Sequence, residues 1–393
     1  MKRFLMLFLG ITLVISSANL AKAENALDEL MKPEGEIKLP GKLSFHGYGE
    51  LHYNSSKADA NVPAETGKDS AARMDFHRMV WGLSYHYNDM ISLHTEVDFE
   101  HAANEIELEF AYLDFLINPA INVRAGAMLM PVGPLNEFHE PPLFYSVERP
   151  YVQNAIIPTT WQEGGAGIFG SPLPGLKYRL YVVSGLNGSK FRASDGIRKG
   201  RGKVAGGEVQ PLSGDELAVV GRLEYTAVPG LTLGGSAYSG GANQEADPAL
   251  DGVGVTIFEG DIRYRKFGLD LTGVYTQIDI DDAEKINAKT GELVGEKLVG
   301  WYVEGAYDIL RPLALQSEKR LMAFVRYEQI NTQDEVPTGF TADPKNDRNV
   351  ITYGLAYYPI TSVAIKADVE NWENEAATNN DGNRFNLAVA YMF

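Results

Sequence analysis

Carboxylate side chains recur at every second position in one stretch of this sequence. Six of them lie on either side of residues 101–104: Glu96, Asp98, Glu100, Glu105, Glu107 and Glu109. Every second side chain of a strand points to the same face, so each run predicts an acidic face. If 101–104 form a turn, Glu100 faces Glu105, Asp98 faces Glu107 and Glu96 faces Glu109. Because like charges opposite each other destabilise a strand pair, this acidic wall needs bound cations, an arginine from an inserted loop or raised carboxyl pKa values.

Basic side chains form a second set, on the polar positions of other predicted strands. The set consists of Arg78, Arg124, Lys177, Arg179, Arg222, Arg263, Arg265, Arg326 and Lys366. If these cations face the acidic wall across a water-filled space, the resulting transverse electric field would orient polar solutes. The alternative is that water and counter-ions screen both sets, which then have no selective role.

No residue pattern predicts catalysis or a cofactor. The chain of 393 residues has no cysteine, which excludes disulfides, thiolate metal clusters and cysteine nucleophiles. It has no nucleotide fingerprint and no nucleophile elbow. His46, His52, His86 and His94 fall on the inward-facing positions of adjacent predicted strands, where a metal site is one interpretation, but their spacing matches no metal motif. We predict no catalytic residue, no metal and no cofactor. The formal net charge of -17 argues against a nucleic-acid partner.

The N-terminus has the three parts of a secretory signal peptide. Lys2 and Arg3 form a positive region, residues 4–15 form an apolar core, and residues 21–23 form a small-residue cleavage site. We predict a signal peptide over 1–23 and a short periplasmic segment over 24–41. A retained helical anchor is the alternative, although the apolar core is too short to span a bilayer.

From residue 42 onward, apolar and polar residues alternate with the period of two that is typical of strands. In one stretch the apolar face consists of Ile106, Leu108, Phe110 and Tyr112. Short turn signals and longer connections alternate along 42–393 and predict sixteen strands, with 14 or 18 as alternatives. This arrangement is typical of a transmembrane antiparallel β-barrel. The predicted fold class is therefore all-β.

A soluble β-sandwich is the alternative, because its strands alternate in the same way. Here, however, aromatic residues such as Tyr85, Tyr87 and Tyr357 gather near strand ends, as in the girdles of membrane barrels. The last strand alternates up to the C-terminal Phe393. That ending resembles the signal by which bacterial assembly machinery recognises outer-membrane barrels.

The loop 130–163 is unusually apolar for a solvated segment. As the third external loop of the predicted barrel it needs a surface to pack on, so we expect it to fold inward and narrow the lumen. Its candidate constriction residues are Glu137, Glu148, Arg149 and Trp161. The alternative is that it packs outside, against a neighbouring subunit. The next long loop, 188–214, is basic.

The stretch 126–170 has a family resemblance. It reads GAMLMPVGPLNEFHEPPLFYSVERPYVQNAIIPTTWQEGGAGIFG, with Pro131 and Gly133, then Glu148-Arg149-Pro150, Ile157-Pro158, Trp161 and a glycine-rich strand. This pattern is similar to that of the phosphate-selective porin O and P superfamily. The resemblance implies a homotrimeric porin in the outer membrane of a Gram-negative bacterium. Phosphate-specific members line their constriction with arginine and lysine, whereas the loop 130–163 offers only Arg149.

Together these features predict a water-filled diffusion channel for small hydrophilic solutes or ions, surrounded by outer-membrane lipid and lipopolysaccharide. Two other functions stay open: a barrel enzyme of phospholipase or protease type, and a non-conducting structural surface protein. The sign of ion selectivity also stays open. The overall acidity favours cations, whereas the basic loop and the resemblance favour anions such as phosphate.

Overall fold

The computed structural model describes residues 41–55, 72–201, 216–312, 318–378 and 381–393. The chain divides into two compact units, 1–42 and 43–393, and the second contains the β-structure from Leu43 onward. The predicted signal peptide, the predicted segment 24–41 apart from Gly41, and the part 202–214 of the basic loop lie outside the described residues. Within the described ranges, no helix is long and apolar enough to cross a membrane.

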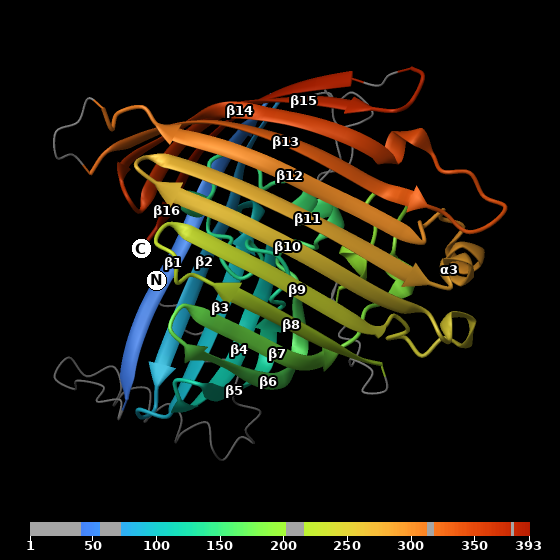
Figure 1. Ribbon diagram of the computed structural model, residues 1–393, viewed down its shortest axis with the longest axis horizontal. Coiled ribbons are helices and arrows are strands. Elements are labelled where there is room, and N and C mark those ends of the chain that lie inside the picture. Colours follow the sequence, from blue (N-terminus) through green and yellow to red (C-terminus); the bar gives the residue numbers. More distant parts are fainter. Residues whose placement is uncertain (1–40, 56–71, 202–215, 313–317, 379–380) are drawn as a thin grey trace, which may run out of the picture. The chain divides into compact units, whose positions relative to one another are not determined.

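Sixteen antiparallel strands form one closed barrel, in which each strand pairs with its neighbours in the chain and β1 pairs with β16 (Figure 1). The strands are β1(Lys42–Asn54), β2(Arg73–His86), β3(Ile91–Glu100), β4(Glu105–Asn118), β5(Ile121–Leu129), β6(Gln162–Leu173), β7(Leu176–Ser184), β8(Leu217–Tyr225), β9(Leu231–Gly241), β10(Gly254–Lys266), β11(Leu269–Asp281), β12(Lys297–Asp308), β13(Arg320–Glu335), β14(Asp347–Ile360), β15(Val363–Asn374) and β16(Asp381–Met392). The predicted all-β fold and its sixteen strands are confirmed.

The C-terminal residue takes part in closing the barrel. Tyr48 of β1 lies opposite Met392 of β16. The Phe393 amide donates to the Gly47 carbonyl oxygen at 2.8 Å, and the Gly47 amide donates back to Phe393 at 3.1 Å. The Phe393 ring lies 5.8 Å from the Phe45 ring. Closure pairs the first strand with the last, so neither presents a free edge of backbone donors and acceptors.

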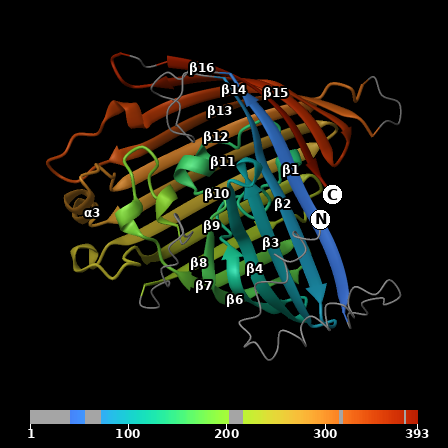
Figure 2. The same cartoon turned by 180° about the vertical axis from the view of Figure 1, so that it is seen from behind.

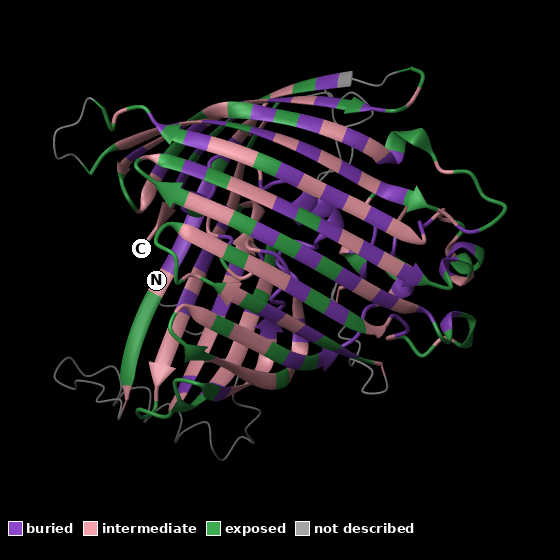
Figure 3. Ribbon diagram, in the orientation of Figure 1, coloured by how far each residue is buried: buried purple, intermediate pink, exposed green. Residues whose placement is uncertain are grey.

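Side chains alternate between the two faces of the strands, as the bands of buried and exposed residues in Figure 3 show. In β11, Leu269, Leu271 and Tyr275 are exposed, whereas Asp270 and Thr276 are buried. The outward face is therefore apolar and the inward face contains many polar groups. This is the reverse of a soluble sandwich, which buries its apolar face, and it is the pattern of a barrel that faces lipid.

The connections differ between the two ends of the barrel. At one end, which we call the turn end, six strand pairs from β2–β3 to β14–β15 are joined by the short turns that the sequence predicts. The β12–β13 connection at this end, 309–319, is longer and is missing from that prediction. The other end, the loop end, has most of the longer connections, including the loop that contains the helix α3(Ala283–Thr290) (Figure 2).

A β-bulge in β4 changes which side chains face inward. Two predicted pairs are present: Glu100 with Glu105, and Asp98 with Glu107. The register then shifts next to Val97, so that Glu96 lies opposite Phe110, and the predicted Glu96–Glu109 pair is wrong. The predicted outward orientation of Phe110 and Tyr112 is also wrong, since both line an internal cavity. An extra residue on one strand reverses the alternation of every residue beyond it.

The loop 130–161 folds into the barrel, as the sequence predicts. Its residues Val152, Ile156 and Trp161 belong to an apolar cluster with inward side chains of β7 to β15. A second cluster joins Tyr145 to side chains of β12 to β16, and the Tyr145 ring lies 6.1 Å from that of Phe324. The loop therefore fills the lumen beside β7 to β16, and open space is left beside β1 to β7.

Gly167 of β6 provides a test of this interior packing. A Cβ atom there would lie 2.2 Å from the carbonyl oxygen of Leu180 and 2.6 Å from the Tyr181 ring. We expect Gly167→Ala to lower the unfolding temperature of the detergent-solubilised barrel, because overpacking typically costs about 1 to 3 kcal/mol. Heat-dependent migration in gel electrophoresis measures this temperature. Gly260→Ala is the matched control, since a Cβ there meets nothing within 4 Å. Equal unfolding temperatures for the two variants would contradict the packing.

Candidate functional site

Hydrogen bonds to several strands hold the loop 130–161 across the lumen. The Tyr145 hydroxyl donates to Asp270 of β11 at 2.6 Å. The Lys366 ammonium of β15 donates to the Ser146 carbonyl oxygen at 2.8 Å. Other strand residues that bond to the loop are Ser236, Arg326, Glu328, Asp368 and Glu370. Each bond contributes only about 0.5 to 1.5 kcal/mol, but bonds from several strands together fix one position of the loop.

Glu148 connects the loop to the seam between β1 and β16. Its carboxylate accepts a hydrogen bond from Asn54 at 3.0 Å, and it lies 3.7 Å from His52 and 3.9 Å from Arg384. Burial alone would raise the pKa of Glu148, but the hydrogen bond and charge of His52 and the charge of Arg384 hold it well below its usual value. Glu148 is therefore a carboxylate at neutral pH and stays paired with these cations.

A charged cavity of about 240 Å³ lies between the loop and β1 to β4, near the loop end. Its carboxylates are Glu50, Glu100, Glu105, Glu107 and Glu148, and its arginines are Arg78, Arg149, Arg198 and Arg201. Four predicted site residues of the strands and two of the constriction loop thus line one cavity. The sequence prediction did not assign Glu50 to the acidic set, because it lies on a strand distant in sequence from the two glutamate runs.

Arg78 lies within the acidic wall and not opposite it. Its guanidinium is 3.1 Å from Glu50, 3.8 Å from Asp98 and 3.7 Å from Glu100. All four side chains are at most 18% exposed. The repulsion between the predicted carboxylate pairs is therefore offset in part by an arginine, as the sequence argument required, and this arginine comes from the neighbouring strand β2.

Arg149 and Arg201 provide positive charge on the loop side of the cavity. Arg149 donates to the Thr159 hydroxyl and to a backbone carbonyl oxygen, and Arg201 donates to the Thr160 hydroxyl at 3.1 Å. Among the described residues, neither guanidinium has a carboxylate within 4.0 Å. Burial and the charge of Arg198 lower the pKa of Arg201 to about 10, and burial and Arg78 lower the pKa of Arg149. Both remain cations at neutral pH.

Most predicted basic residues of the strands are already paired, within the wall or, for Arg179, with Glu137 of the inward loop. The closest ion pairs are Arg222–Asp261 at 2.7 Å, Arg326–Glu328 at 2.6 Å, Arg263–Asp270 at 2.6 Å, Arg124–Asp114 at 2.8 Å and Arg179–Glu137 at 3.1 Å. Lys177 and Arg265 are more than half exposed, and Lys366 bonds to the loop. The positive side of the charged cavity therefore comes from the loops, not from the strands that the sequence argument proposed.

The other two constriction-loop residues lie away from the charged cavity. Trp161 is fully buried; its indole N–H donates to Glu163 at 2.9 Å, and its ring lies 5.1 Å from that of Tyr238. Glu137 pairs with Arg179, and burial raises its pKa in spite of that arginine. Trp161 thus belongs to the apolar base of the loop, and Glu137 to a second cavity.

This second cavity, of about 390 Å³, lies on the turn side of the first. The border between the two consists of Tyr48, Glu109 and His139: Tyr48 donates to Glu109 at 3.1 Å, and His139 lies 2.7 Å from Glu109. Phe110 and Tyr112 form part of its wall, together with the predicted site residues Glu96 and Glu137. The sequence gives no signal for this cavity, because without the bulge both rings fit the lipid-facing pattern.

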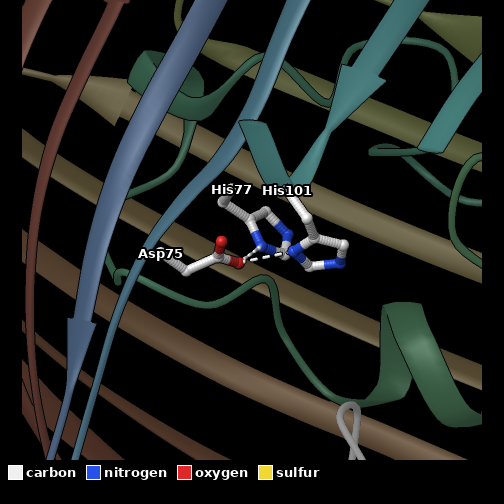
Figure 4. A group of neighbouring side chains, drawn as sticks. All are labelled: Asp75, His77 and His101. Atoms are coloured by element: carbon white, nitrogen blue, oxygen red, sulfur yellow. Dashed lines mark hydrogen bonds and ion pairs between the residues drawn. The ribbon is translucent and has the colours of Figure 1, made fainter. Parts of the chain in front are cut away.

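Asp75, His77 and His101 lie together (Figure 4), and the two histidines line the charged cavity. Asp75 Oδ2 is 2.7 Å from His101 Nδ1 and 3.3 Å from His77 Nδ1. Two imidazoles and a carboxylate are ligand types that suit zinc or copper. However, Arg78 Nη2 lies 3.0 Å from His77 Nε2. A neutral imidazole that binds a metal through Nδ1 has its proton on Nε2, where it would meet the arginine donor. We describe the group as a hydrogen-bonded cluster and assign no metal to it.

A curated protein is similar in sequence over most of the chain. An uncharacterized protein of Aquifex aeolicus (strain VF5) is 32% identical over 369 residues, which cover 89% of this chain and 80% of that protein. No protein-family model matches the sequence.

Several solved structures have the same fold. The outer membrane channel DcaP of Acinetobacter baumannii matches with a TM-score of 0.60 and 12% identity over 91% of this chain and 99% of that chain. OmpF of Salmonella typhi, in complex with daunomycin, matches with a TM-score of 0.56 and 12% identity, over 90% of this chain and 98% of that chain. An anion-selective porin from Comamonas acidovorans matches with a TM-score of 0.52 and 9% identity, over 90% of this chain and 100% of that chain. At these identities the likeness concerns the fold, which is that of outer-membrane porins.

Removal of Arg78 tests its place in the acidic wall. We expect Arg78→Ala to destabilise the barrel by about 3 to 5 kcal/mol, because several buried carboxylates lose their cation. The unfolding temperature in detergent measures the loss. Lys177→Ala is the control, since this lysine is 55% exposed and makes an ion pair at 3.6 Å. A change for Arg78→Ala as small as that for Lys177→Ala would show that the wall does not depend on the arginine.

Proposed function

We propose that this chain, which belongs to the same family as the Aquifex aeolicus protein, is a porin of a Gram-negative outer membrane that passes small hydrophilic solutes and ions by diffusion. One observation carries the proposal. The loop 130–161 folds into a sixteen-stranded barrel and leaves a cavity with most of its carboxylates on the strand side and most of its arginines on the loop side. Porins restrict passage by pore width and by the charges that line the narrow region.

The opposed charges of the cavity suggest how solutes are oriented. Glu105 and Glu107 project from β4, whereas Arg149 and Arg201 project from loops. The field between these groups acts in a low-dielectric surrounding, where it is screened less than at an open surface. A dipolar or zwitterionic solute would enter with its positive end toward β4 and its negative end toward the arginines.

Phosphate is one solute that this proposal covers. The resemblance of 126–170 to phosphate-selective porins supports it, and so do the two arginines that have no carboxylate partner among the described residues. Cations would follow the β4 side, so the balance between the two walls decides the sign of selectivity.

The export and assembly of the chain complete the proposal. Residues 1–23 are a signal peptide, 24–41 are a periplasmic segment, and the turn end faces the periplasm. Phe393 is recognised by the barrel assembly machinery, and the mature protein is a homotrimer in contact with lipid and lipopolysaccharide. The apolar outward face supports the contact with lipid.

Reversal potentials in a salt gradient test the two walls separately. We expect the double variant Glu105→Gln/Glu107→Gln to shift selectivity toward anions, and Arg149→Gln/Arg201→Gln to shift it toward cations, each by several-fold in permeability ratio. Glu284→Gln in the exposed helix α3 is the control for the glutamate variant, since it removes one carboxylate charge outside the cavity. If both double variants keep the unmodified reversal potential, the two walls do not select ions.

Liposome swelling separates a channel from the other functions of a barrel. We expect proteoliposomes to swell in solutions of small sugars or amino acids, at a rate that falls with solute size. Swelling without hydrolysis of lipid or peptide supports a porin. Turnover without swelling would indicate a barrel enzyme, and the absence of both would indicate a structural protein.

A further inference from the structure

The second cavity has an aromatic wall that neither ion passage nor the charged cavity explains. Six rings line its 390 Å³: Tyr48, Phe110, Tyr112, Phe138, Phe169 and Tyr181. They come from β1, β4, β6, β7 and the inward loop. Phe138 is 51% exposed although it lies on a loop that fills the lumen. Exposure of an aromatic ring to the water of the lumen costs free energy unless another group packs against the ring.

The rings continue from the cavity toward the turn end. The Phe110 and Tyr112 rings are 5.3 Å apart, and Tyr112 lies 5.4 Å from His94, which lies 6.0 Å from His86. His86 is the last residue of β2, next to the short turn. The first two of these ring pairs are tilted by only about 30° to each other. A row of rings on neighbouring strands thus runs from the cavity toward the turn end, although His86 is nearly perpendicular to His94.

Arg124 adds a planar polar group to the same wall. Its guanidinium lies 3.9 Å from the centre of the Tyr112 ring and 4.9 Å from that of Phe169. Two hydrogen bonds to Asp114, of 2.8 and 2.9 Å, fix its plane. A guanidinium held in this way keeps its other N–H groups for a further acceptor.

The remaining polar groups of the cavity are mostly paired already. Glu137 pairs with Arg179 at 3.1 Å, and Glu96 pairs with His46 at 2.9 Å. Three lining residues have a buried polar atom without a hydrogen-bond partner among the described residues: Arg179 at Nη1, Tyr181 at its hydroxyl and Glu140 at the acceptor Oε2. A buried acceptor without a donor is costly, so a ligand that donates a hydrogen bond there is favoured.

These groups favour a neutral ring with hydroxyl groups over an ion. An anion would meet three carboxylates, and a cation would meet two arginines. A hydroxyl group both donates and accepts, so it matches Glu140 and the guanidinium groups at once. The C–H face of a saturated ring is apolar and carries weak positive charge, which suits the negative face of an aromatic ring. The cavity also falls in the size range of small-molecule sites, roughly 300 to 1,000 Å³.

We propose that the second cavity is a binding site for cyclic sugars, formed by Phe110, Tyr112 and Phe138 for the ring face and by Arg124 and Glu140 for the hydroxyl groups. This inference rests on the proposed function, since a sugar reaches the cavity only through an open channel. It extends that function from unselective diffusion to passage through a saturable site.

Block of the ion current by added sugar tests the site. Protein in a planar bilayer is titrated with glucose, and in parallel with mannitol, which has a similar size and similar hydroxyl groups but no ring. We expect glucose to reduce the current saturably and mannitol to reduce it only in proportion to solution viscosity. Phe110→Ala and Phe138→Ala should each weaken the glucose effect by about tenfold. Phe340→Ala is the control, because Phe340 is equally exposed but lies in the external loop 336–346.

The outcomes separate this inference from the proposed function. If glucose and mannitol act alike while ions pass, the sugar site is absent and the porin function stands. If no variant conducts ions, the proposed function itself fails. Phe138→Ala replaces a half-exposed loop residue, so it leaves the barrel intact, and its heat-dependent migration verifies this. Unchanged glucose block in a folded Phe138→Ala protein would overturn the assignment of the aromatic wall.

Discussion

Peptide groups find no hydrogen-bond partner in hydrocarbon, and most of this structure follows from that constraint. All sixteen strands pair on both sides, and the last residue, Phe393, completes the seam with Gly47. An apolar outward face then requires every second side chain to point inward. Most charged residues of the strands therefore lie on the inward face, where each charge must be paired with another, hydrated, or available to interact with a solute.

Ion pairs of the strands and packed apolar residues of the inward loop occupy much of the lumen. Beside β7 to β16, Arg326 pairs with Glu328 of its own strand and Arg222 of β8 pairs with Asp261 of β10, and the loop 130–161 packs its apolar residues against the same side of the barrel. Beside β1 to β7 the loop leaves two cavities in series. The cavity nearer the loop end is charged and the one nearer the turn end is aromatic, so under the proposed function a solute that crosses the barrel would meet both.

The sequence predicts the fold well because alternation and turn residues are local signals. The strand number, the inward loop and the Glu100–Glu105 pair all follow from them. The site is predicted only in part. The bulge at Glu109 has no sequence signal of its own, and it turns Phe110 inward. Likewise, the alternation of side chains predicts that Arg78 faces the lumen. It does not predict that Arg78 lies among Glu50, Asp98 and Glu100, because that position depends on strand neighbours that are distant in sequence.

The most direct test uses the absence of cysteine from the chain. Single cysteines from position 105 to 112 would carry nitroxide labels in a lipid bilayer, and collisions with oxygen or with a water-soluble nickel chelate would report lipid or water around each label. We predict water at Glu105 and Glu107, lipid at Ile106 and Leu108, and no lipid at Phe110 or Tyr112. Lipid contact at Phe110 equal to that at Leu108, or no alternation from 105 to 108, would contradict the account.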